Sequence, residues 1–141
     1  MASEWVCRKI QTWFQSNIDK CTKLQAFAAN LEGWLKAEVG LAMRDSGKRR
    51  LPALAVQLKV KPSDHGIGHG KESADLLIGP ARPEHGAIHA GQTPRIWLEL
   101  KHRTDWNWKG LEHDLTKWDG MPWTAHDEVL AGIVVNQSPW R

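Results

Sequence analysis

Residues 95–102 read RIWLELKH, in which apolar side chains alternate with aromatic or charged ones. Successive side chains of a strand point to opposite faces of a sheet, so this pattern predicts a strand with one purely apolar face. The other face presents Trp97, Glu99 and Lys101 together. Because charged groups under the cover of a large aromatic ring are costly to bury, we expect this face to serve a purpose beyond packing.

Three further segments predict strands of the same sheet. Ala53–Val60 alternates apolar residues with small or polar ones, and Ala74–Ile78 is a short apolar run that begins with an acid, Asp75. Val129–Val135 is rich in Val and Ile without interruption, which is typical of a strand covered on both faces. The glycine- and histidine-rich residues 61–71 predict a loop between the first two strands.

Apolar residues at helical spacing predict three helices, over about residues 3–21, 22–44 and 104–120. Thr22 opens a capping-box signature and is the expected start of the second helix. Glu38 falls within the apolar stripe of that helix. An ionised carboxylate is unfavourable there unless something compensates it.

The order of these elements predicts an α/β fold, with a mixed four-stranded sheet flanked by helices in the sequence α-α-β-β-β-α-β. We expect residues 1–141 to form one domain, since 141 residues suit a single hydrophobic core. A hydrophobic content of 41% excludes a disordered chain. No apolar run is long enough to span a membrane, and the first residues do not read as a signal peptide, so we expect a cytoplasmic protein with free thiols at Cys7 and Cys21.

Asp75, Glu99 and Lys101 are the residues to which the pattern assigns chemistry. Glu99 and Lys101 are two apart on one strand and enter the same space, and Asp75 joins them if its strand pairs beside theirs. Carboxylate oxygens, together with the backbone carbonyl of Leu100, are hard ligands of the kind that hold Mg²⁺ or Mn²⁺. A metal there would activate a water for phosphodiester hydrolysis, and Lys101 would orient that water.

At these residues the sequence resembles the PD-(D/E)xK nuclease superfamily. The motif residues are Asp75 and then Glu99-Leu100-Lys101, with Glu38 in the position of the acid on the helix before the first core strand. The resemblance covers about residues 24–136, although Ala74 replaces the proline of the family's name. It implies a restriction-endonuclease-like sandwich and a Mg²⁺-dependent nuclease. It also implies that Lys117, on the helix after the motif, contacts phosphate.

The formal charge is +3, from 19 Lys and Arg against 16 Asp and Glu, which mildly favours an anionic partner. We expect that partner to be nucleic acid, DNA rather than RNA, bound either with little sequence specificity or with the help of a homodimer or a larger assembly. The residues expected to hold its backbone are basic or lie beside the motif. They are Lys48, Arg49, Arg50, Lys71, His102 and Arg103.

Other interpretations remain open at this point. Glu99 and Lys101 are also compatible with an ordinary ion pair on a solvated sheet face. The chain is also compatible with a nuclease-fold binding module without useful turnover, such as a DNA-structure binder, a phage inhibitor or a subunit of an assembly. Zinc is disfavoured because the pairs His65/His69 and His85/His89 lie among glycines, where a spacing of four gives no shared face.

Overall fold

A computed structural model describes residues 2–25, 32–49, 54–80, 95–103 and 109–135. These residues form three α-helices, one short 3₁₀ helix and four strands. In chain order the elements are α1 (Ala2–Gln25), α2 (Glu32–Gly47), β1 (Leu54–Val60), η1 (Pro62–His65), β2 (Ala74–Pro80), β3 (Arg95–Arg103), α3 (Lys109–Trp118) and β4 (Asp127–Val135).

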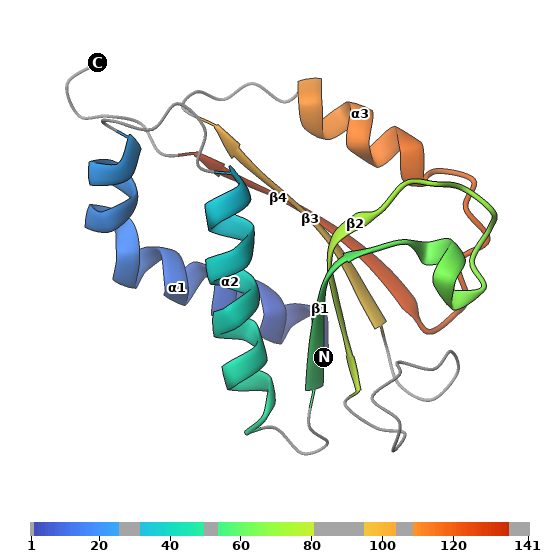
Figure 1. The fold of residues 1–141 in the computed structure, drawn as a ribbon, viewed down its shortest axis with the longest axis horizontal. Coiled ribbons are helices and arrows are strands. Elements are labelled where there is room, and N and C mark those ends of the chain that lie inside the picture. The colour runs from blue at the N-terminus through green and yellow to red at the C-terminus, as the bar shows by residue number, and fades with distance from the viewer. Residues whose placement is uncertain (1, 26–31, 50–53, 81–94, 104–108, 136–141) are drawn as a thin grey trace.

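The four strands form one mixed sheet in the order β1-β2-β3-β4. β1 pairs with β2 and β2 with β3 in antiparallel fashion, whereas β3 and β4 run parallel. α1 and α2 lie on one side of the sheet, and α3 lies on the other side with the loop that contains η1 (Figure 1). The predicted α/β class, the order of elements and the mixed four-stranded sheet are confirmed. None of the described helices is long and apolar enough to cross a membrane.

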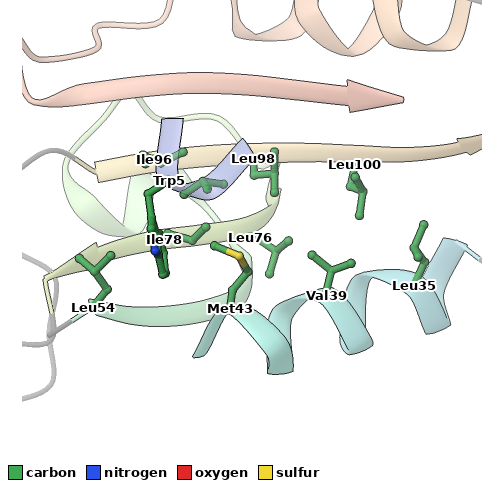
Figure 2. Packing of buried hydrophobic residues seen from close by; sticks show 11 residues of the cluster. Trp5, Leu35, Val39, Met43, Leu54, Leu76, Ile78, Ile96, Leu98 and Leu100 are labelled. Carbon is green, nitrogen blue, oxygen red and sulfur yellow. The ribbon is translucent and has the colours of Figure 1, made fainter. Parts of the chain in front are cut away.

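The alternating pattern of residues 95–102 divides the side chains of β3 between two hydrophobic cores, one on each face of the sheet. Ile96, Leu98 and Leu100 pack under α1 and α2, where α2 brings Leu35 and other side chains against them (Figure 2). On the opposite face of β3, Trp97 packs in a second cluster. That cluster contains Val60, Ile67, Ala74, Leu77, Trp97 and Trp118.

The boundary expected between the first two helices was wrong. α1 continues to Gln25, and the Thr22 hydroxyl donates to the carbonyl of Ile18 within the helix, at 2.9 Å, instead of capping a new one. The buried stripe of α2 runs through Leu35, Val39 and Met43. Glu38 therefore lies beside the buried stripe instead of within it, because the helix is rotated relative to the predicted pattern.

The pairing of β2 with β3 stops before the N-terminal end of β2. It extends from the Ile78–Ile96 pair to the Leu76–Leu98 pair, although β2 begins at Ala74. The backbone of β2 therefore separates from β3 just at Asp75. This gap at the end of the ladder is where the charged residues of β2 and β3 meet.

Candidate active site

Asp75 lies where β2 and β3 separate, and its side chain takes the place of a backbone hydrogen-bond acceptor from β2. Its Oδ2 accepts a hydrogen bond from the backbone N–H of Leu100 at 2.8 Å. Its Oδ1 lies 2.8 Å from Nζ of Lys36, on α2. Both carboxylate oxygens therefore have partners, and the side chain is fixed at the point where the two strands diverge.

Glu99 enters the same space from β3 and is almost completely buried, with 2% of its surface exposed. Its Oε1 accepts a hydrogen bond from Nε1 of Trp118 at 3.1 Å and lies 3.1 Å from Nζ of Lys117. Both partners come from the last turn of α3, where the Lys117 ammonium also lies 4.6 Å from the centre of the Trp118 ring. The end of α3 thus holds Glu99 in place.

The Asp75 carboxylate disfavours ionisation of Glu99. The pKa of Glu99 is raised to about 7, chiefly by burial and next by repulsion from the Asp75 carboxylate, while the Lys117 ammonium acts in the opposite direction. Two carboxylates that share a site need compensating positive charge, which Lys36 and Lys117 supply in this structure. Such a pair is a candidate cation-binding element.

A third acid, Glu32, reaches the site from the first turn of α2. Its Oε1 lies 3.4 Å from Nζ of Lys101 and 3.5 Å from Nζ of Lys36. The acids Glu32, Asp75 and Glu99 are therefore matched by lysines from three different elements. These lysines are Lys36, Lys101 and Lys117.

Glu32, not Glu38, is the acid that α2 contributes. A helix turns by about 100° per residue, so Glu38 lies roughly 200° around the helix from Lys36, whereas Glu32 and Lys36 share one face. In the part of the chain that the structure describes, Glu38 forms no ion pair with the motif residues. Glu32 therefore lies among the motif residues where Glu38 was expected, and its i, i+4 spacing from Lys36 is the signal in the sequence that could have identified it.

The remaining predicted site residues are placed differently. Lys117 does reach the motif, on Glu99. Lys48 and Arg49 are exposed just beyond α2, and Lys71 is exposed on the connection that leads into β2. His102 and Arg103 belong to β3, but their side chains lie outside the described residues, as does all of Arg50.

The donor set suits a hard divalent cation that needs few protein ligands. Asp75, Glu99 and the backbone carbonyl of Leu100 are the oxygen groups that would hold it, and Mg²⁺ commonly uses one or two carboxylates and keeps several waters. Across the described ranges, no cluster of three or more His, Cys, Asp or Glu residues is arranged as a metal site. His65 instead packs edge-on against Trp97, with ring centres 5.6 Å apart, and His85 and His89 lie outside the described residues.

Sequence reasoning missed Lys36 and the role of Trp118. The sequence analysis assigned no role to Lys36, and from its helical spacing Trp118 was expected only to pack as an apolar residue. The free thiols are confirmed, with Cys7 exposed and Cys21 buried. Comparisons with protein-family models, with curated proteins and with solved structures find no match, so the function must be argued from the geometry of this site.

Proposed function

We propose that the chain is a metal-dependent nuclease that hydrolyses phosphodiester bonds of DNA with low intrinsic sequence specificity. The observation that carries the proposal is the pair Asp75 and Glu99, two carboxyl groups brought into one buried space from adjacent strands. Burial and the Asp75 carboxylate raise the pKa of Glu99 despite the Lys117 ammonium, and carboxyl pairs perturbed in this way cluster at functional sites. A divalent cation between the two carboxylates removes the repulsion.

Each residue of the site has a role in this proposal. Asp75 and Glu99 hold Mg²⁺ or Mn²⁺, with the Leu100 carbonyl as a further ligand. The bound cation supplies charge neutralisation at the phosphate and a lowered pKa for a coordinated water. Lys101 orients the attacking water, and Glu32 fixes the Lys101 ammonium through their 3.4 Å ion pair.

The two lysines that now pair with the acids would change partners. Lys36 lies 2.8 Å from Asp75 and Lys117 lies 3.1 Å from Glu99, so each ammonium sits where positive charge is required. With a cation on the acids, Lys36 and Lys117 would be free to contact a phosphate oxygen. The phosphate is thereby positioned between groups that stabilise charge in the transition state.

The arrangement of elements supports the same proposal. The element order and the site at the divergence of β2 and β3 resemble the restriction-endonuclease-like sandwich of the PD-(D/E)xK superfamily. In this proposal Asp75, Glu99 and Lys101 take the motif positions, and Glu32 takes the position of the helix acid. Because a small domain offers little surface for base contacts, we also propose weak specificity or action as a homodimer.

A binding module with the same fold and no useful turnover is the second candidate. One observation favours it: the three acids are already matched by lysines, so the site is electrically balanced without a metal. Such a module would bind nucleic acid, or a partner protein, and would not cleave. The two candidates differ in turnover, which a single assay measures.

The assay incubates the purified chain with linear duplex, single-stranded and branched DNA and with RNA, in Mg²⁺, in Mn²⁺ and in EDTA. We expect metal-dependent cleavage of DNA that is lost in Glu99→Gln and Lys101→Ala and retained in Glu112→Gln, which changes an exposed acid of α3. Cleavage that survives Glu99→Gln would assign the activity to another site or to a contaminant. Binding without cleavage in either metal would establish the second candidate.

A further inference from the structure

Lys59 stands opposite Asp75 in the β1–β2 ladder. The pairs on either side, Leu58 with Leu76 and Val60 with Ala74, are in register, which places Lys59 and Asp75 across from each other. Opposite residues of antiparallel strands have Cα atoms only about 5 Å apart. The backbone of Lys59 is therefore next to that of Asp75, and the sequence already places Lys59 in a basic region that could hold a nucleic-acid backbone.

The backbone at Lys59 is unusual. Among the residues that the structure describes, it is the one non-glycine residue with a positive φ, at 51°. The left-handed conformation crowds the Cβ atom of any residue except glycine, and asparagine tolerates it best among the others. A lysine is thus an unfavourable choice on backbone grounds.

This conformation reverses the faces of the strand. Leu58 lies on the α2 side, where a Cβ added at Gly40 would be 2.9 Å from its Cδ2, whereas Val60 packs in the core on the α3 side. A regular strand would put residues 58 and 60 on the same face. The reversal lies at the level of Asp75. The irregular backbone at Lys59 is thus at the same level of the sheet as the point where β2 separates from β3.

The side chain of Lys59 differs from the other lysines around the site. It is exposed, and no ion pair or hydrogen bond of its ammonium is seen within the described ranges. Lys36, Lys101 and Lys117 are each paired with an acid of the site. Lys59 therefore carries an exposed positive charge on the strand next to Asp75 and is not used to neutralise an acid of the site.

We propose that Lys59 binds a backbone phosphate of the nucleic-acid strand that enters the site. This role rests on the proposed nuclease function and deepens it. Glycine would adopt this backbone conformation more readily than lysine. We therefore attribute the presence of a lysine at position 59 to a contact that its ammonium group makes. Lys59 is thus a positioning residue that holds the strand, while Asp75 and Glu99 act on the phosphate to be cleaved.

The test measures binding of a short fluorescent DNA duplex to the full chain by anisotropy, in Ca²⁺ without Mg²⁺ or Mn²⁺, between about 50 and 200 mM KCl. Lys59→Gly and Lys59→Asn keep the left-handed backbone and remove the charge. We expect both variants to bind about three- to tenfold more weakly, with a slope of log affinity against log salt that is smaller by about 0.9. Lys59→Arg restores both values, and the thermal midpoint of Lys59→Gly is equal to or above that of the parent chain.

Lys23→Gln is the control, because it removes an exposed lysine from α1. It should leave affinity and salt slope unchanged. Parent-like affinity and slope in Lys59→Gly would overturn the proposal, and so would an equal loss in Lys23→Gln. Those results would leave cleavage by the parent chain and its loss in Glu99→Gln intact. A parent chain that binds no nucleic acid would overturn the role of Lys59 and the proposed function together.

Discussion

Asp75 and Glu99 meet where β2 and β3 stop pairing, and each is held by groups from a different helix. Asp75 is held by Lys36 of α2 and by the backbone N–H of Leu100, and Glu99 by the last turn of α3. The two helices lie on opposite sides of the sheet (Figure 1). Helices from both sides of the sheet therefore contact this pair of acids. The geometry of the site thus depends on both helical layers as well as on the sheet.

Glu99→Gln is expected to stabilise the fold while abolishing cleavage. Because the pKa of Glu99 rises from 4.5 to about 7 on folding, the folded chain binds more protons than the unfolded chain between these values, and its stability falls as pH rises through this window. Replacing the carboxyl group by a neutral amide should raise the free energy of unfolding by about 1–3 kcal/mol at pH 8 and by much less near pH 4.5. Urea denaturation at the two pH values measures this, with Glu112→Gln as the control. Equal stability of the parent and Glu99→Gln at pH 8 would show that the pair carries no repulsion.

Metal binding should depend steeply on pH near neutrality. A cation must displace the proton that Glu99 retains below its pKa of about 7, so affinity should fall by up to about tenfold for each pH unit below that value. We expect Mn²⁺ to raise the thermal midpoint at pH 8, to have little effect at pH 6, and to lose its effect when EDTA is added. Asp75→Asn should remove the response at both pH values. A Mn²⁺ response that is independent of pH would place the cation away from Glu99.

Asp127 is expected to matter for stability without being part of the site. It accepts two hydrogen bonds from Arg95, at 2.7 and 3.0 Å, and one from Nε1 of Trp97, and both members of the ion pair are buried. Although burial opposes it, hydrogen bonds from Arg95, Trp97 and Thr124 keep the pKa of Asp127 below its usual value, so this stabilisation is present above the usual range for a carboxyl and is lost as pH falls. Asp127→Ala should cost about 3–5 kcal/mol, because it leaves the Arg95 charge buried and unpaired.

The measurement is chemical denaturation of Asp127→Ala beside the double variant Asp127→Leu with Arg95→Met. Replacing both charges by apolar side chains should recover most of the loss, since the cost comes from the unpaired guanidinium and not from the absence of the pair. A double variant as unstable as Asp127→Ala would contradict this explanation.

The fold class and the strand-borne motif could be predicted from the sequence because both depend on strict periodicity. Alternation in residues 95–102 places Glu99 and Lys101 on one face whatever the rest of the chain does. The acid at Asp75 was identified because it opens a short apolar strand. These inferences are local, and only the pairing of two neighbouring strands was needed to bring the residues together.

The helix acid could not be placed in the same way. Its identity depends on the rotation of α2, which is set by packing of Val39 and Met43 on the sheet and not by local sequence. Because the second helix was expected to begin at Thr22, Glu32 was expected in the middle of that helix, and its i, i+4 spacing from Lys36 was not considered. The left-handed backbone of Lys59 was equally hidden, because nothing in a lysine marks a positive φ.

Glu32→Gln and Glu38→Gln form a matched pair that tests the corrected assignment. Both remove one negative charge from α2, but only Glu32 lies within ion-pair distance of Lys101 and Lys36. Without the Glu32 carboxylate the Lys101 ammonium loses its anchor, so we expect the cleavage rate to fall about ten- to a hundredfold, within the range that supporting residues of a metal site show. Glu38→Gln should cleave within about twofold of the parent chain, because a surface substitution of this kind changes stability by less than about 0.5 kcal/mol. Initial rates at saturating Mn²⁺ decide between the two acids. A large loss in Glu38→Gln with parent-like rates in Glu32→Gln would restore the assignment that the sequence alone suggested and would require a different rotation of α2.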